Sequence, residues 1–211
     1  MSADERARMV ERQLRRRGIY DERVLAAMGR VPRERFVPPE LRESAYGDAA
    51  LPIGGGQTIS QPYMVALICE QLALHGSERV LDVGTGSGYQ AAVLAELAAE
   101  VHSIERLPEL AERARGSLAA AGYLDRVHVH VGDGTRGLAE EAPFAAIAVA
   151  AAAPGVPQTL YEQLEPRGRL VVPVGGPSGQ LLEVVIRTPE GPATIRSVPC
   201  RFVPLVGQEG F

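Results

Sequence analysis

The stretch Val80-Leu-Asp-Val-Gly-Thr-Gly-Ser-Gly88 decides the fold of this chain. An apolar run typical of a buried strand leads into three alternating glycines, and the helix-like Tyr89-Gln-Ala-Ala-Val-Leu-Ala-Glu-Leu97 follows directly. Glycine allows a sharp turn and lets a ligand lie against bare main chain. A strand that feeds such a turn and then a helix N-terminus is how open α/β sheets hold a nucleoside-bearing cofactor.

The composition is that of an ordinary soluble globular protein. Of the 211 residues 45% are hydrophobic and 23% charged, so one domain with a substantial core is expected. The net charge of −4 argues against a protein that binds nucleic acid mainly through its phosphates. The start is charged and no apolar run could cross a bilayer, which predicts a cytoplasmic protein. Cys69 and Cys200 form neither a metal-ligand set nor a disulfide framework, so we expect free thiols and no metal.

The N-terminal part, residues 1–78, is expected to hold helices and a glycine-rich segment. A first helix is predicted over 3–17, with Ala7, Val10 and Leu14 near one face. Arginines crowd the rest of its surface, which favours a solvated face over a patch for an anionic partner. Asp21 is placed to cap a second helix.

The segment 51–63, Leu-Pro-Ile-Gly-Gly-Gly-Gln-Thr-Ile-Ser-Gln-Pro-Tyr, is unusual because three consecutive glycines are costly to order. It can be a surface loop or a functional element. Thr58 and Ser60 precede a helix expected over 64–74, and hydroxyls at a helix entrance commonly cap it. Both a capping and a functional interpretation of these hydroxyls stay open.

From residue 79 to residue 211 short apolar strands alternate with helices. This pattern predicts a mostly parallel sheet covered on both faces, in one domain with the N-terminal part. Only turns separate the last strands, so an antiparallel C-terminal pair is expected. Strands are predicted over 79–83, 100–104, 127–131, 144–150, 168–174, 180–187 and 194–203, and helices over 88–99, 108–121 and 156–164.

Acidic residues follow the strands at the end where such sheets bind ligands. Glu105, 21 residues after Gly84, can accept hydrogen bonds from both hydroxyls of a ribose; the alternative is a plain strand-end acid. Asp133, between two glycines, can accept from the amine of adenine, or be an ordinary turn residue. Asp82 can orient the amides of the glycine loop, or help to bind the cationic end of a cofactor that carries a methionine group.

The spacing of the glycines favours S-adenosylmethionine over a dinucleotide. A pyrophosphate-binding turn carries a third glycine where this chain has Tyr89, and an acid-lined cleft suits a sulfonium cation. An NAD-dependent oxidoreductase is less consistent with the sequence, because the chain has no lysine for a Tyr-x-x-x-Lys pair. The glycine loop is also compatible with a methyltransferase that acts on RNA or a small molecule, and with a cofactor-binding module without chemistry.

Several motifs resemble one family. The chain is similar, over about residues 8–206, to the protein-L-isoaspartate (D-aspartate) O-methyltransferases, and the Gln57-Thr-Ile-Ser-Gln-Pro62 stretch is the most specific part of the likeness. The segments that carry the resemblance are Leu51–Met64, Val83–Ala95, Ser103–Arg106, Gly132–Gly134, Ala151–Pro154 and Arg201–Leu205.

The resemblance implies a Rossmann-like class I methyltransferase and a reaction. A methyl group passes from S-adenosylmethionine to the free carboxylate of an L-isoaspartyl or D-aspartyl residue in a damaged protein, leaving S-adenosylhomocysteine. The ester then closes to a succinimide, which starts repair. The family's catalytic serine corresponds to Ser60, and its peptide site to Ile59, Ser60, Leu205 and Val206. The expected cofactor-binding residues are Thr58, Ile59, Ser60, Asp82, Gly84, Gly86, Ser87, Gly88, Glu105, Arg106, Gly132 and Asp133.

Two positions depart from the family pattern. Ala145 and Ala150 stand where the family usually has aspartate and threonine, and both are expected near the floor of the cleft. The four histidines fall outside the cleft motifs, and no general base is needed because the nucleophile is a carboxylate already ionised at neutral pH.

We expect a monomer that acts on isoaspartyl-containing proteins and peptides and that binds neither nucleic acid nor a membrane.

Overall fold

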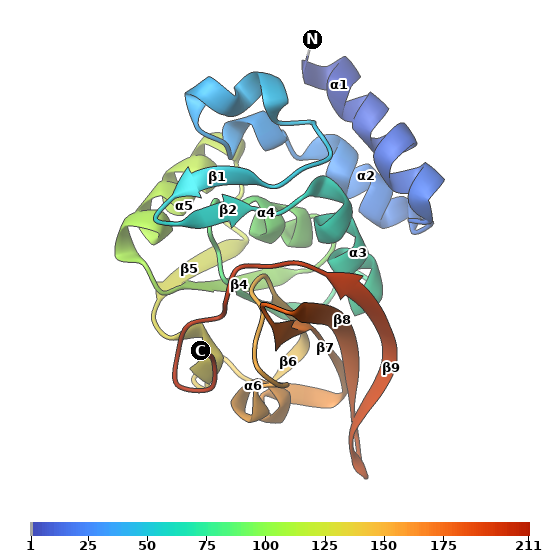
Figure 1. The fold of residues 1–211 in the computed structure, drawn as a ribbon, viewed down its shortest axis with the longest axis vertical. Helices are drawn as coiled ribbons and strands as arrows, with labels where there is room; N and C mark the ends of the chain where they lie inside the picture. The colour runs from blue at the N-terminus through green and yellow to red at the C-terminus, as the bar shows by residue number, and fades with distance from the viewer. Residues whose placement is uncertain (1) are drawn as a thin grey trace.

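A seven-stranded sheet forms the centre of the protein, in the computed structural model that describes residues 2–211. The strand order is β5-β4-β3-β6-β7-β8-β9 (Figure 1). Strands β3 to β7 run parallel, and β8 and β9 are antiparallel additions at one edge, which confirms the predicted α/β class. The strands are β3 Arg79–Val83, β4 Glu100–Glu105, β5 Val127–Val131, β6 Phe144–Val149, β7 Leu164–Gly176, β8 Gly179–Thr188 and β9 Gly191–Cys200.

Short connections make the last three strands antiparallel. Only residues 177–178 join β7 to β8, and residues 189–190 join β8 to β9, whereas a parallel pair needs a crossover of a dozen residues or more. Pairing continues up to both turns, from Gly176 opposite Gly179 to Thr188 opposite Gly191. Strands β7 and β8 are longer than the predicted 168–174 and 180–187, and β9 begins and ends three residues before the predicted 194–203.

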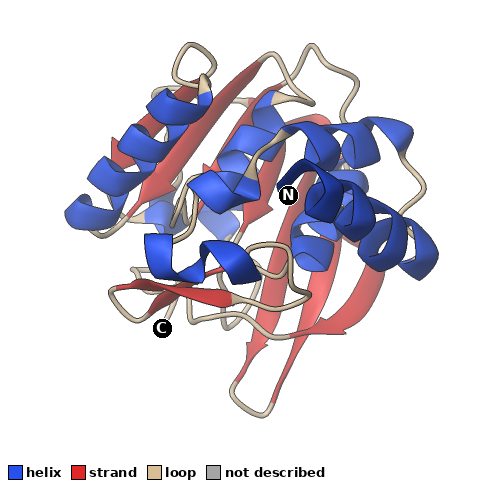
Figure 2. Ribbon diagram, turned by 90° about the horizontal axis from the view of Figure 1, so that it is seen from above, coloured by secondary structure: helices blue, strands red, loops and turns tan. Residues whose placement is uncertain are grey.

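Alternate residues of each strand pack on opposite faces of the sheet. Val80 and Val101 belong to a hydrophobic cluster that includes α3, α4, α5 and the N-terminal helices. Leu81 and Ile104 belong to a second, smaller cluster, which includes Leu160 of α6. Helices therefore cover both faces, and the larger number lies on one of them (Figure 2). These helices are α3 Pro62–Leu72, α4 Tyr89–Ala95, α5 Pro108–Ala121 and α6 Gln158–Glu162.

The N-terminal helix buries the predicted face only in part. Helix α1 (Ser2–Met9) continues through a wide π turn and a 3-10 turn to residue 17 and ends at Gly18, which has a φ of 93°. Leu14 is buried and the half-buried Val10 packs against the core, as predicted, whereas Ala7 is exposed and Met9 is buried instead. The wider turn explains this correction, because i→i+5 hydrogen bonding brings residues five apart onto one side of the helix.

Helix α2 (Glu22–Arg30) begins as predicted at Asp21, whose side chain accepts from the backbone N–H groups of Arg23 and Val24 at 2.8 and 3.4 Å. Short 3-10 turns follow at Arg33–Arg35 (η3) and Pro39–Ser44 (η4). Within residues 2–211 no helix is long and apolar enough to span a bilayer. Both cysteines are free, and Cys69 is buried.

The glycine-rich segment, for which a surface loop was one of two interpretations, is a β-hairpin. Strand β1 (Leu51–Gly54) pairs with β2 (Gln57–Ile59). All three glycines of the turn have positive φ, at 87°, 61° and 72° for Gly54, Gly55 and Gly56, which explains why side-chain-free residues are needed. The guanidinium of Arg113 in α5 donates to the Ile53 carbonyl at 3.1 Å, and this fixes the hairpin above the sheet.

Candidate active site

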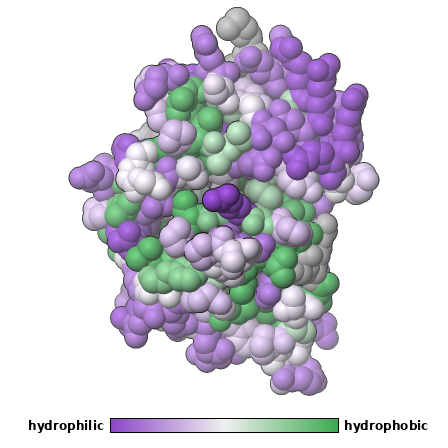
Figure 3. All heavy atoms as spheres, viewed as in Figure 1, coloured by the Kyte–Doolittle hydropathy of each residue, from purple (hydrophilic) through white to green (hydrophobic). Residues whose placement is uncertain are grey.

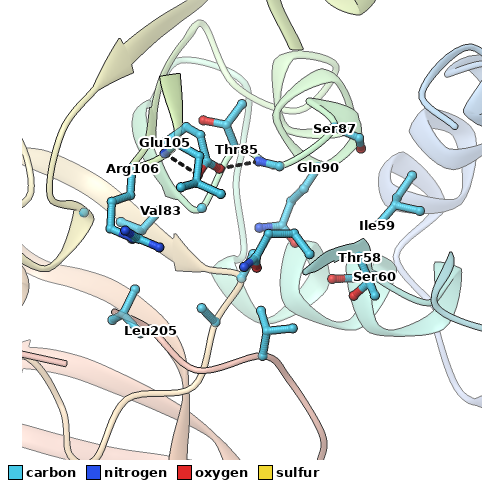
Figure 4. Close-up of a pocket in the computed structure, with 18 of the residues that line it drawn as sticks. Thr58, Ile59, Ser60, Val83, Thr85, Ser87, Gln90, Glu105, Arg106 and Leu205 are labelled. Atoms are coloured by element: carbon cyan, nitrogen blue, oxygen red, sulfur yellow. Dashed lines mark hydrogen bonds between the residues drawn. The ribbon is translucent and has the colours of Figure 1, made fainter. Parts of the chain in front are cut away.

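A cleft opens at the carboxyl ends of β3, β4 and β6, where ligands bind in sheets of this type. The hairpin side contributes residues 57–60, and the chain after β9 contributes residues 203–206 (Figure 4). Sequence segments up to about 150 residues apart therefore meet around one space. Of the residues expected at the site, Thr58, Ile59, Ser60, Gly84, Gly86, Ser87, Glu105, Arg106, Leu205 and Val206 line it.

The glycine loop turns back across the end of its strand. Gly84, Gly86 and Gly88 have φ values of 92°, 53° and 87°, a region that other residues rarely adopt. The N–H of Gly84 donates to the Ile104 carbonyl at 2.9 Å, which ties the loop to β4. Gly84 and Gly86 present bare main chain to the cleft, whereas Gly88 lies one step behind it, at the start of α4 and near Leu118.

Glu105 is the carboxylate that reaches the cleft. It is buried, and its two oxygens accept from the backbone N–H groups of Gly86 at 2.9 Å and Leu107 at 3.0 Å (Figure 4). Each oxygen has a further lone pair, so the group can still accept from a ligand hydroxyl. Glu105 is therefore a hydrogen-bond acceptor whose orientation is fixed by two backbone N–H groups, and not an exposed acidic residue at the end of a strand.

Asp82 lies behind the cleft wall and does not line the cleft. Its oxygens accept from Gln90 Nε2 and Ser103 Oγ, both at 2.8 Å, and Ser103 Oγ lies 2.6 Å from Thr85 Oγ1. Complete burial raises the pKa of Asp82 to about 6, against the opposing effect of these two hydrogen bonds. These hydrogen bonds allow Asp82 to orient Gln90 and, through Ser103 and Thr85, the glycine loop. A direct contact between Asp82 and the cofactor stays a prediction.

Asp133 also stands outside the cleft lining. Its Oδ1 accepts from the N–H and hydroxyl of Thr135 at 2.9 and 2.7 Å, and its Oδ2 accepts from the N–H of Gln208 at 2.9 Å. It therefore caps the turn η5 (Gly134–Arg136) and holds the C-terminal tail, as its turn interpretation expected. The adenine contact of Asp133 and the cofactor contact of Gly132 stay predictions, and it is Gly134 that lines the cleft.

Ser60 lies where the hairpin meets α3. No side chain caps the start of that helix, so the capping interpretation of the hydroxyls finds no support among the described hydrogen bonds. Ser60 is partly exposed and lines both this cleft and a neighbouring hollow that contains Gln61 and Tyr63. Its hydroxyl can therefore serve ligands that arrive from two directions.

Some residues of the cleft lining were not predicted from the sequence. Gln90, Gly134, Val203 and Pro204 all border the cleft. The position of Gln90, directly after the glycine loop and one residue into a helix, could have identified it. The other three lie within the segments Gly132–Gly134 and Arg201–Leu205, which carry the family resemblance, and that position could have identified them.

Comparison with known proteins identifies the chain's relatives. The profile of the protein-L-isoaspartate(D-aspartate) O-methyltransferase family matches residues 4–210. The chain belongs to this family. A protein-L-isoaspartate O-methyltransferase from Methanoculleus marisnigri is 55% identical over 207 residues, which are 98% of this chain and 94% of the relative.

Solved structures agree. A protein-L-isoaspartate O-methyltransferase superposes with a TM-score of 0.85 at 28% identity, over 97% of this chain and 66% of that longer chain. A Plasmodium falciparum structure described as a protein of the same kind, in complex with S-adenosyl-L-homocysteine, has a TM-score of 0.82 at 28% identity, over 95% of this chain and 98% of the other. The protein is thus an S-adenosylmethionine-dependent methyltransferase of class I fold, as predicted.

The cleft fits such a donor. Bare backbone at Gly84 and Gly86, which both line the cleft, admits close approach of a ligand. Glu105 supplies an oriented acceptor for ribose hydroxyls, and the apolar side chains of Ile104 and Leu107 border the same space.

The two departures from the family pattern lie in different places. Ala150 lines the cleft, as expected. Ala145 does not, and the expectation that it lies near the cleft floor is wrong. It follows Phe144 at the opposite end of β6, beside a separate hollow that includes Ser77 and Glu78. An alanine there changes a surface far from the glycine loop.

Proposed function

We propose that this protein transfers the methyl group of S-adenosylmethionine to the free carboxylate of L-isoaspartyl, and D-aspartyl, residues in damaged proteins and peptides. The family membership of nearly the whole chain carries this proposal. The cleft supports it, because a donor site built on Gly84, Gly86 and Glu105 adjoins a hydroxyl, Ser60, that also faces a second opening for a peptide.

The donor supplies an electrophilic methyl group on a sulfonium, and the protein's own residues arrange the acceptor. An isoaspartyl carboxylate is ionised at neutral pH, so no proton has to be removed. In keeping with this, no histidine of the described chain lines the cleft. Ser60 donates a hydrogen bond to the substrate carboxylate and directs its other oxygen toward the donor.

Positioning is then the main source of catalysis. Alignment of two reactants can lower a barrier by on the order of 7 kcal/mol or more. The β1–β2 hairpin, with its three-glycine turn, closes over both ligands and keeps water out. Ile59, Leu205 and Val206 form the apolar wall against which the peptide lies.

The remaining parts of the proposal concern cell biology and assembly. We infer a monomer, because both ligand openings belong to one copy, and activity without nucleic acid, because the chain has a net charge of −4. A cytoplasmic location is a further part of the proposal.

The test is methyl transfer from labelled S-adenosylmethionine to paired synthetic peptides. One peptide carries L-isoaspartate and the other normal aspartate at the same position. We expect label in a base-labile ester on the first peptide only. Equal labelling of both peptides, or of neither, would reject the proposed substrate.

A further inference from the structure

A second hollow continues from the cleft past Ser60. The two openings share Thr58, Ser60, Ala150 and Val203, so a chain bound in one can pass directly into the other. Its lining comes from the end of the N-terminal helix, the start of α3 and the chain that leaves β9. Three charged side chains line it, and they are Arg17, Asp48 and Arg201.

Arg17 is held at the rim of this hollow. Its guanidinium carbon lies 3.8 Å from the centre of the Tyr63 ring, and its Nη1 lies 2.7 Å from Asp48 Oδ2. A guanidinium has five N–H donors, so the contact with Asp48 leaves others available. Among the arginines that crowd the first helix, this one is thus oriented toward the substrate side, while polar side chains elsewhere over α1 face solvent (Figure 3).

Arg201 is the second cation of the hollow. It is exposed, it directly follows β9, and within the described residues its guanidinium has no salt bridge or side-chain hydrogen bond. With Asp48 offsetting one arginine, the three groups leave one positive charge beside the opening. This local charge is opposite in sign to that of the whole chain, whose net charge is −4.

We infer, on the basis of the proposed function, that this hollow holds the residues next to the isoaspartate and selects substrates with an acidic neighbour. Arg201 is the main specificity-determining residue, and Arg17 supports it from the opposite rim. The occupant is a stretch of damaged protein, because the hollow is continuous with Ser60. Charge complementarity sets which stretch is preferred.

The experiment compares two isoaspartyl peptides that differ at one position, where one has Gln and the other has Glu. This position lies two residues before the isoaspartate in one pair of peptides and two residues after it in a second pair. In the wild-type protein at low salt we expect the Glu peptide to have a KM about two- to five-fold lower on the side that occupies the hollow, the range for exposed ion pairs. The difference should disappear at about 0.5 M salt, where screening extends over only a few ångströms.

Variants assign the effect to residues. Arg201→Gln should bring the ratio of the two KM values close to one, and Arg17→Gln should reduce it. Arg16→Gln is the control, because Arg16 is an exposed neighbour outside the hollow and should leave the wild-type ratio intact.

The outcomes separate this inference from the proposed function. If both peptides are methylated with equal KM on either side, or if Arg201→Gln leaves the ratio unchanged, the charge selection is wrong and the methyltransferase activity stands. If neither peptide is methylated, the proposed function fails and this inference fails with it.

Discussion

Glu105 and Gly86 are joined by a hydrogen bond of 2.9 Å from the backbone N–H of the glycine to the carboxylate. This bond links the end of β4 to the loop that follows β3. A residue chosen from sequence as a ribose acceptor therefore also holds the loop that surrounds the donor. Donor affinity should depend on it in two ways, through the ligand contact and through the shape of the loop.

Glu105→Gln should weaken binding of S-adenosylmethionine by about 1–3 kcal/mol, the scale of a lost hydrogen bond to a charged group. Isothermal titration calorimetry measures this directly. Glu109→Gln, an exposed carboxylate at the first turn of α5, is the matched control and should bind like wild type. An unchanged affinity in the Glu105 variant would reject the ribose role.

Ser60→Ala should fold and bind the donor normally but lose turnover about ten- to a hundred-fold, because a hydrogen bond to the reacting carboxylate is removed. The measurement is kcat on an isoaspartyl peptide, with donor affinity measured alongside. Ser77→Ala, in an exposed loop away from the cleft, should keep full turnover. Wild-type turnover in the Ser60 variant would mean that this hydroxyl takes no part in the reaction.

The buried carboxylate of Asp82 makes stability depend on pH. Its pKa is raised by burial to about 6 in the folded protein, from a reference of 3.8. Protonation therefore favours the folded state, and this contribution is complete below pH 3.8 and is lost as the pH rises through 6.

The side chain of Asp82→Asn cannot ionise. Its amide oxygen can still accept from Gln90, and its NH2 group can donate to the hydroxyl of Ser103. Its stability relative to wild type should therefore rise by about 1 kcal/mol between pH 5 and pH 7.5. Urea unfolding at the two pH values gives this difference, with the exposed Asp125→Asn as a control that shows no such trend. A constant difference would show that Asp82 is not the titrating group.

The hairpin turn can be tested with a pair of glycines. Gly56→Ala places a side chain at a φ of 72° with no atom within 4 Å, so only the backbone conformation is penalised, by about 1–2 kcal/mol. Gly116→Ala lies within α5 and also meets no atom within 4 Å, so it should stabilise the protein by about 0.5–1 kcal/mol. Thermal unfolding should shift in opposite directions for the two variants.

Local patterns predicted the central sheet well. The strands over 79–83 and 127–131 and the helix over 108–121 have the predicted bounds, because apolar runs there are closed by turn residues or capped by proline and glycine. The hairpin was not predicted, since its strands have only four and three residues, and the proline and glycine of β1 weaken any alternating signal.

The site was predicted in part, for a similar reason. The positions of the glycine loop and Glu105 follow from the strands that directly precede them in the sequence, and both line the cleft as predicted. Asp133 is held by Thr135, as its turn interpretation expected, and also by Gln208, a residue 75 positions away whose contact no local pattern shows. The charged hollow likewise depends on Arg17 and Arg201, which come from opposite ends of the chain.

The most direct test is a crystal structure with S-adenosylhomocysteine and an isoaspartyl peptide. We expect the donor product to lie against Gly84 and Gly86, with its ribose on Glu105, and the free carboxylate of the peptide to lie within hydrogen-bonding distance of Ser60 Oγ. A product bound outside this cleft, or a carboxylate held away from Ser60, would contradict the proposed mechanism.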